Sequence, residues 1–235
     1  MSLASNMKGL DTSKVEVDDD DQAPPTIAAG SKEERALLVE LEALLPAECA
    51  GVSQEIKLMC LRGRKYDPAR GAALVPDLLA LIGELGLDKS DPAMWTQIST
   101  GKVCPTGAKD AQGRAIVWLR FARHEPRVYD AKKFGALIAT MMLRTLRDPD
   151  VARCGIVIIQ DMRGISLSNL DPSAAKFVFG HVFPRLPVRV GRIVAFHPPW
   201  IVGHVILPIV MAFMSKKLKA RKRSPQLRCC TFACS

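Results

Sequence analysis

The basic residues near the end of the chain have the clearest chemical meaning, because they follow a long uncharged stretch. Fifteen uncharged residues, 200–214, run directly into a cluster of Lys and Arg. The cluster consists of Lys216, Lys217, Lys219, Arg221, Lys222 and Arg223. Cations at this density bind anionic partners, of which nucleic acid and anionic lipid are the obvious candidates. The neighbouring apolar stretch favours lipid, since each Lys or Arg near an anionic leaflet contributes about 1 kcal/mol.

The distribution of charge along the chain supports the same interpretation. The formal net charge of the 235 residues is +9. Residues 1–171 carry 22 basic and 24 acidic side chains, whereas residues 172–235 carry eleven Lys or Arg and no Asp or Glu. Nucleic acid is the less favoured partner, because the few aromatic residues are not interleaved with the basic ones as stacking platforms would be.

Side chains that could act as acids, bases or nucleophiles form no catalytic pattern. The histidines are His124, His181, His197 and His204. None has an E-x-x-H or H-x-E companion, and the sequence contains neither G-x-S-x-G nor a P-loop. Asp161 at a strand end could be catalytic in an α/β fold, but Arg163 two residues later favours a structural ion pair. We therefore predict a protein that is not an enzyme and uses no cofactor or metal.

Cysteine usage and the first residues of the chain bear on its compartment. Seven cysteines, an odd number without regular spacing, favour reduced thiols. Residues 1–25 lack the apolar core that a signal peptide needs, so we expect a cytoplasmic protein that associates peripherally with membranes. Cys229 and Cys230 follow the basic cluster, and two interpretations stay open for them: palmitoylation, or free thiols in a loose tail.

A disordered tail and a helical lobe are expected in the first part of the chain. Residues 1–30 are polar and acidic and indicate a disordered acidic tail. Residues 31–90 fit a helical N-terminal lobe, with helices over residues 31–45, Gln54–Arg64 and Pro68–Leu85. Ser31 and Glu34 have the spacing of a capping box at the start of the first helix. The apolar face of this helix is expected to contain Leu37, Leu38, Leu41, Leu44 and Leu45.

Beyond the helical lobe, the sequence pattern predicts alternating strands and helices. Short apolar runs that fit strands occur at 114–123, 154–162 and 191–199. Helical patterns lie between them at 131–147 and 171–186, the second beginning with an N-capping Asp171 and Pro172. Strand, helix, strand, helix, strand predicts an α/β layer with a mostly parallel sheet. The strands are apolar on both faces, as buried parallel strands are.

Five segments in a fixed order carry a resemblance to a known family. They are CLRGRKYDPARG (60–71), DAQGRAIVWLR (110–120), GIVIIQDMRGISLS (155–168), FPRLPVRVGRIVAFHPPWI (183–201) and FMSKKLKAR (213–221). Together they resemble the CRAL-TRIO family of lipid-binding and lipid-transfer proteins, nearest to the branch of the alpha-tocopherol transfer protein and cellular retinaldehyde-binding protein. The resemblance covers roughly residues 35 to 221.

The resemblance implies a helical N-terminal lobe followed by a CRAL-TRIO α/β lobe, here residues 91–221, that encloses an apolar cavity closed by a gate helix. Residues 200–214 match the gate. The C-terminal part of the lobe is incomplete relative to the family, and residues 222–235 form a basic, Cys-containing tail. By the same resemblance, the positions expected to bind phosphoinositides are Arg64, Arg189, Lys217, Lys219 and Arg221.

The sheet and the helices that face it are expected to line the lipid pocket. The candidate lining residues are Ile116, Trp118, Leu137, Met141, Ile156, Ile158, Val178, Val182, Ile193, Val205, Ile206 and Ile209. Which face each strand residue occupies is not fixed by the sequence, because a shift of one residue moves every side chain of a strand to the other face.

Residues 200–214 allow a spanning helix or a helix that covers the core. A transmembrane helix needs about 20 consecutive apolar residues, and Pro208 interrupts this shorter run, so a gate helix is favoured. The sequence therefore predicts non-enzymatic binding and transfer of a hydrophobic lipid ligand, with docking on the anionic surface of phosphoinositide-containing membranes. The alternative is a membrane-associated interaction module that keeps the outline of the fold without a working cavity.

Overall fold

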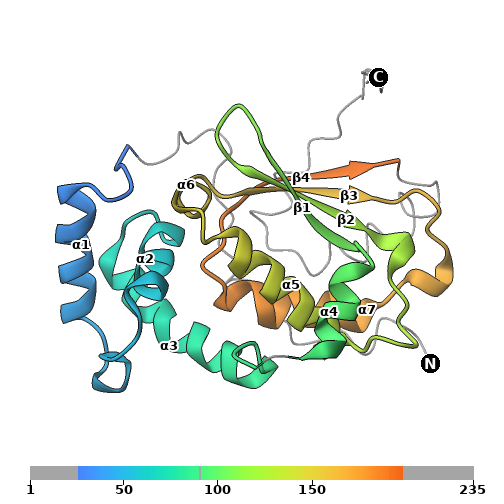
Figure 1. Cartoon of the computed structure of the whole chain (residues 1–235), viewed down its shortest axis with the longest axis horizontal. Helices are drawn as coiled ribbons and strands as arrows, with labels where there is room; N and C mark the ends of the chain where they lie inside the picture. Colours follow the sequence, from blue (N-terminus) through green and yellow to red (C-terminus); the bar gives the residue numbers. More distant parts are fainter. Residues whose placement is uncertain (1–25, 90, 198–235) are drawn as a thin grey trace.

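A helical lobe begins the computed structural model, which describes residues 26–89 and 91–197 (Figure 1). The lobe contains α1 (Lys32–Ala43), the short turn η3 (Ala47–Cys49), α2 (Gln54–Gly63) and α3 (Pro68–Leu85). All three predicted helices are present, and α3 has the predicted bounds. The first helix is shorter than predicted: Leu44 caps it and is 56% exposed, so this residue is not part of the apolar face.

The α/β lobe follows and supplies the sheet. Its elements in chain order are α4 (Pro92–Ser99), β1 (Val103–Lys109), β2 (Ala115–Arg120), η4 (Phe121–Arg123), α5 (Ala131–Thr145), α6 (Pro149–Cys154), β3 (Ile156–Asp161), η5 (Leu167–Asn169), α7 (Pro172–Phe177), η6 (Val178–Val182), η7 (Phe183–Arg185) and β4 (Val190–Phe196). The predicted strands correspond to β2, β3 and β4. The helix predicted at 171–186 is divided into α7, a π-helical turn at η6 and a 3₁₀ turn at η7.

The sheet has the strand order β1-β2-β3-β4. Strands β2, β3 and β4 run parallel, and β1 pairs antiparallel with β2 at one edge. The predicted α/β fold with a mostly parallel sheet is therefore confirmed for the part of the chain that the structure describes. Helices α4, α5 and α7 lie together on one side of this sheet (Figure 1), where Leu137, Ile138 and Met142 of α5 join the main apolar cluster.

Asp-Pro pairs begin four of the helices. Asp67, Asp91, Asp148 and Asp171 each cap a helix with a side-chain oxygen that accepts a backbone N–H, and a Pro follows each of them. Aspartate satisfies a donor that the first turn leaves unpaired, while proline fits the first helical position because its missing N–H is not needed there. These local signals therefore fix where α3, α4, α6 and α7 start.

A glycine allows the two lobes to touch backbone to backbone. Gly63 ends α2, and a Cβ atom placed on it would lie 2.2 Å from the carbonyl oxygen of Pro187, in the segment before β4. A second contact joins the lobes at α3, where Glu84 accepts from Arg185 at 2.8 Å and lies 2.7 Å from His181 Nε2. The first contact excludes any side chain, whereas the second is partly exposed.

A buried ion pair organises the helical lobe itself. Arg62 Nε and Nη2 donate to the two carboxylate oxygens of Glu34 at 2.7 and 2.9 Å. Tyr66 Oη donates to Glu34 at 3.2 Å, and the backbone N–H of Gly30 donates at 2.6 Å. Half of the predicted capping box is confirmed, because Ser31 accepts from the Glu34 N–H. The Glu34 carboxylate, however, bonds Gly30 and Arg62 instead of completing the box.

Gly63→Ala should destabilise the protein by about 1–3 kcal/mol, the usual cost of forcing an atom into a closely packed site. The matched control is Gly83→Ala in α3, where an added Cβ has no neighbour within 4 Å. That change should stabilise the helix by up to about 1 kcal/mol. Urea unfolding of both variants measures the difference, and equal free energies of unfolding would contradict the close contact.

Arg62→Met should cost about 3–5 kcal/mol, because it leaves the Glu34 carboxylate buried without its guanidinium. Burial alone would raise the pKa of Glu34, but the hydrogen bonds from Arg62 and Gly30 outweigh it, so the pKa is lowered from its ordinary value of 4.5. The stabilisation by this carboxylate is therefore present above pH 4.5 and is lost as the pH falls through the folded-state pKa.

The double variant Glu34→Leu/Arg62→Met removes both charges and should recover most of the stability lost in Arg62→Met. Its free energy of unfolding should also depend less on pH in the acid range than that of the parent. Denaturant unfolding between neutral pH and pH 3 (roughly one unit below the usual carboxyl pKa) tests this. A double variant as unstable as Arg62→Met would show that the pair itself is not the source of the effect.

Candidate functional site

The candidate lipid site is built on one face of the sheet, and the strand register fixes which side chains share that face. Side chains alternate between faces along a strand, and paired residues of parallel neighbours point the same way. Val117 of β2 is paired with Ile158 of β3, which is paired with Ile193 of β4. These three side chains therefore lie in a row across the sheet.

This face and the helices beside it bring most of the predicted pocket residues together. Those in the main apolar cluster or packed directly against it are Leu137, Met141, Ile156, Ile158, Val178, Val182 and Ile193. The sheet contributes Ile156, Ile158 and Ile193, while α5 and the π-helical turn η6 contribute the rest. The three remaining candidates, Val205, Ile206 and Ile209, lie outside the described residues, as do residues 200–214 that match the gate.

Two of the predicted pocket residues lie on the opposite face of the sheet. Ile116 is paired with Val157 and Trp118 with Ile159, so both point away from the row that contains Val117 and Ile158. Their places on the helix-covered face are taken by Val117, which is fully buried, and Leu119, which packs against the cluster. The predicted set therefore combines residues of two faces, because the apolar sequence of β2 does not reveal which of its side chains share a face.

A bulge in the register determines the face of β4. Ile156 is paired with Val190, but the next residue of β3, Val157, is paired with Arg192, so Gly191 is the extra residue. Without this shift, simple alternation from Val190 would have turned Ile193 to the opposite face. The bulge therefore allows Ile193 to lie beside Ile158.

One polar side chain shares the apolar face. Gln160 of β3 is paired with Leu119 of β2 and Ala195 of β4, and it is half-buried. An amide can donate and accept, so it offers a hydrogen bond to a polar group of a bound molecule. The sequence analysis missed Gln160, although strict alternation from Ile158 would have found it.

Two of the predicted phosphoinositide-binding arginines lie at the lobe junction. Arg64 follows Gly63 at the end of α2 and donates to the carbonyl oxygen of Pro184 at 3.2 Å. Arg189, two residues beyond Pro187, donates to the carbonyl oxygen of Arg153 in α6. Both are buried, and burial lowers the pKa of each, for Arg189 to about 10. The other three predicted residues, Lys217, Lys219 and Arg221, lie outside the described part of the chain.

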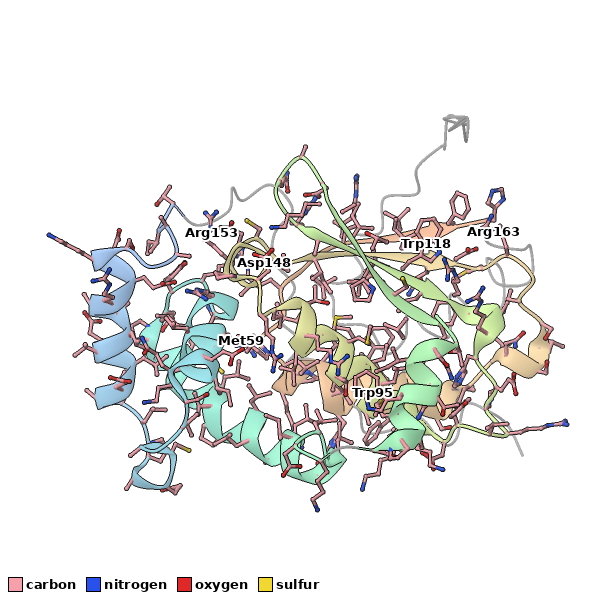
Figure 2. The ribbon with its side chains drawn as sticks, viewed as in Figure 1. Met59, Trp95, Trp118, Asp148, Arg153 and Arg163 are labelled. Carbon is pink, nitrogen blue, oxygen red and sulfur yellow. The ribbon has the colours of Figure 1, made fainter. Side chains whose placement is uncertain are left out.

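Asp161 forms a structural ion pair, as predicted from its spacing to Arg163. Arg163 Nη2 donates to Asp161 at 2.7 Å, and Trp118 Nε1 donates to it at 3.2 Å. Figure 2 shows Trp118 and Arg163 near the same end of the sheet. The hydrogen bonds from Arg163 contribute most to lowering the pKa of Asp161 to about 2. A carboxylate this acidic and fully bonded is a poor general base at neutral pH.

The buried His124 also makes structural contacts. His124 Nε2 lies 3.4 Å from an Asp171 oxygen, and the His124 ring packs on Phe134. Burial lowers the pKa of His124, despite Asp171, so the ring is neutral at physiological pH. Across residues 26–89 and 91–197, no group of His, Cys, Asp and Glu side chains is arranged to hold a metal ion. None of the helices in these ranges is long and apolar enough to cross a bilayer.

The structure is an α/β domain with a mostly parallel sheet, preceded by a helical lobe. The sequence profile of the CRAL/TRIO domain matches residues 98–223, which is more than half of the chain, so the chain belongs to this family. The resemblance drawn from the five segments is thereby confirmed at the level of the family. This family assignment agrees with the prediction that the chain is not an enzyme.

Two known proteins show how far the similarity reaches. The chain is 26% identical over 225 residues to the phosphatidylinositol transfer protein CSR1 of Eremothecium gossypii, with 83% of this chain and 49% of that protein covered. It therefore spans about half the length of this curated relative. The crystal structure of Sfh5 superposes with a TM-score of 0.55 at 14% identity, covering 83% of this chain and 81% of that one, and shows the fold alone.

Proposed function

We propose that the protein binds one hydrophobic lipid on the helix-covered face of the sheet and exchanges it at membranes, without catalysis. The observation that carries the proposal is the match of residues 98–223 to the CRAL/TRIO domain, in which β3, β4, α5 and η6 contribute apolar side chains to the main cluster. The name of the relative, a phosphatidylinositol transfer protein, supports a phospholipid as the cargo. Each CH₂ group moved from water into such surroundings gains about 0.8 kcal/mol, so acyl chains suit this face.

The π-helical turn η6 forms part of the lining of the proposed lipid site, and its geometry suits a lining that adapts to a ligand. Val178 and Val182 are four residues apart on this turn, and both belong to the cluster. π-Helical turns are rare and are frequent at functional sites, because the widened turn re-aims the side chains that follow it. Gln160 adds one amide on the sheet side, which suits a lipid with a polar group near its apolar chains.

Docking on anionic membranes is the second part of the proposal. Arg64 and Arg189 are buried at the lobe junction and donate to backbone carbonyl oxygens, so Lys217, Lys219 and Arg221 are expected to carry most of the docking. Their cationic groups suit the phosphate oxygens of head groups. Basic and acidic side chains are nearly balanced up to residue 171, and only basic ones follow. This distribution supports residues 172–235 as the membrane-facing part of the chain.

A tryptophan on the proposed face should fill the space that the lipid needs. Ile158→Trp and Val182→Trp should each abolish lipid uptake, measured by native mass spectrometry of protein purified from its own cells. The matched control is Ile159→Trp, which enlarges the neighbouring residue of β3 on the opposite face. The control should load lipid as the parent does.

Unchanged uptake by both Ile158→Trp and Val182→Trp would remove the pocket from this face of the sheet. If the parent protein itself carries no lipid, the alternative prediction is favoured, namely an interaction module with the outline of the fold but no working cavity. Circular dichroism and thermal melting of each variant separate loss of uptake from loss of folding.

Lys217→Gln/Arg221→Gln should weaken binding to phosphoinositide-containing liposomes by about 2 kcal/mol, at about 1 kcal/mol for each charge removed. The loss should shrink at high salt, because screening already weakens the attraction in the parent. Binding to neutral liposomes and lipid loading should hardly change. Liposome co-sedimentation at low salt measures the effect, and parental affinity in the double variant would contradict a docking role for these residues.

A further inference from the structure

Two arginines meet at the carboxyl end of β2. Arg120 is the last residue of β2, and its Nη1 donates to the carbonyl oxygen of Gly101 at 3.3 Å. Arg123 in η4 donates through its Nη1 to the carbonyl oxygen of Thr100 at 2.7 Å. Thr100 and Gly101 immediately follow α4, so both guanidinium groups lie over the backbone at the end of this helix.

Gly101 allows these guanidinium groups to come close to each other. Its φ is +61°, in the left-handed region that favours glycine. A Cβ atom placed on it would lie 2.9 Å from Arg123 Nη1 and 3.2 Å from Arg120 Nη1. Because both nitrogens surround the same point, a side chain at position 101 would occupy the space between the two cations.

No acidic side chain within residues 26–89 and 91–197 forms an ion pair with Arg120 or Arg123. Asp161 is opposite Arg120 in the strand register, but Arg163 and Trp118 occupy its oxygens. Each guanidinium donates one of its N–H groups to a carbonyl oxygen, so most of its donors are left for another acceptor. Two neighbouring cations with unused donors repel each other until an anion lies between them.

We propose that Arg120 and Arg123, brought together over Gly101, bind a phosphate monoester group. The paired N–H donors of a guanidinium match two oxygens of a phosphate group. Two guanidinium groups can therefore bind one tetrahedral phosphate from two directions. The site lies at the carboxyl ends of the parallel strands, the edge at which open α/β sheets bind ligands. Arg123 is exposed and Arg120 half-buried, so the group can reach the site from solvent.

This site is separate from the proposed docking patch. Arg189 precedes Val190 at the amino end of β4, whereas Arg120 is level with the other end of that strand through Asp161 and Phe196. Five residues of parallel strand span about 16 Å, so one phosphate cannot bridge the two ends. The proposal therefore does not depend on the lipid cargo or on Lys217 and Arg221.

The phosphate can belong to a soluble molecule or to a lipid head group. Asn169 Nδ2 donates to the carbonyl oxygens of Ala122 and His124, which holds η5 beside η4. Leu167 of η5 is 67% exposed, and Val128, just beyond η4, is 56% exposed. These apolar side chains are the reason to test a membrane-borne phosphate together with a free one.

The test compares the full chain with Arg120→Gln/Arg123→Gln. Binding of inorganic phosphate is followed by calorimetry, and binding to phosphatidylcholine vesicles with and without phosphatidic acid by co-sedimentation. The variant should lose at least about tenfold in affinity for one or both probes, as expected when charge-assisted hydrogen bonds are removed. Loss confined to the vesicles identifies a head group, and loss for inorganic phosphate identifies a site that also accepts free phosphate.

The matched control, Lys32→Gln/Arg35→Gln, removes the same charge from α1, which lies at the other end of the molecule from η4 (Figure 1). It should bind both probes as the parent does, and equal loss in the control would overturn the proposal. So would parental affinity of a folded Arg120→Gln/Arg123→Gln protein for both probes. If that variant does not fold, Arg123→Glu on the exposed side chain replaces it with the same expected loss. Lipid loading by native mass spectrometry should be unchanged in every variant, which separates this site from the proposed cargo function.

Discussion

The close contact between Gly63 and Pro187 is the constraint on which the arrangement of the two lobes depends. A helix end meets the segment before β4 with no side chain between them, so the two backbones are in direct contact. The contact places Arg64 beside Pro184 and brings the segment that leads into β4 under the helical lobe. The contact of Glu84 with Arg185 and His181 adds a second link between α3 and the α/β lobe. The two lobes also share the main apolar cluster, to which Leu74, Leu78 and Leu81 of α3 contribute.

The charged residues at the two ends of the sheet differ in how deeply they are buried. At the amino ends of the strands, Arg64 and Arg189 are buried, and the loss of water lowers the pKa of both. At the carboxyl ends, Asp161 is satisfied by Arg163, while Arg120 and Arg123 lie over Gly101 nearer to solvent. Burial makes the first pair part of the packing between lobes, whereas accessibility makes the second pair available to a ligand. The apolar row of Val117, Ile158 and Ile193 lies between these ends.

Local signals predicted the elements that have strong local causes. Apolar periodicity predicted α3 with its observed bounds, and the spacing of Asp161 and Arg163 predicted their ion pair. The sequence analysis did not identify α4 and α6, although Asp91-Pro92 and Asp148-Pro149 mark their starts. It also missed β1, whose Pro105 and Gly107 are poor strand formers. Such residues are tolerated because β1 is an edge strand that relies on its pairing with β2.

The sequence by itself determined the family, the helical lobe, the order of the three parallel strands with α5 and α7 between them, and the accumulation of positive charge after residue 171. These features depend on composition and on contacts between residues close in the chain. Only the tertiary structure decided the parity of β2 and β4, because strands that are apolar on both faces carry no alternation to read. It also decided that Ile193 faces the cluster, through the bulge at Gly191, and that Arg120 and Arg123 meet over Gly101. Those arrangements arise from strand pairing and from contacts between segments some twenty residues or more apart, which no local pattern encodes.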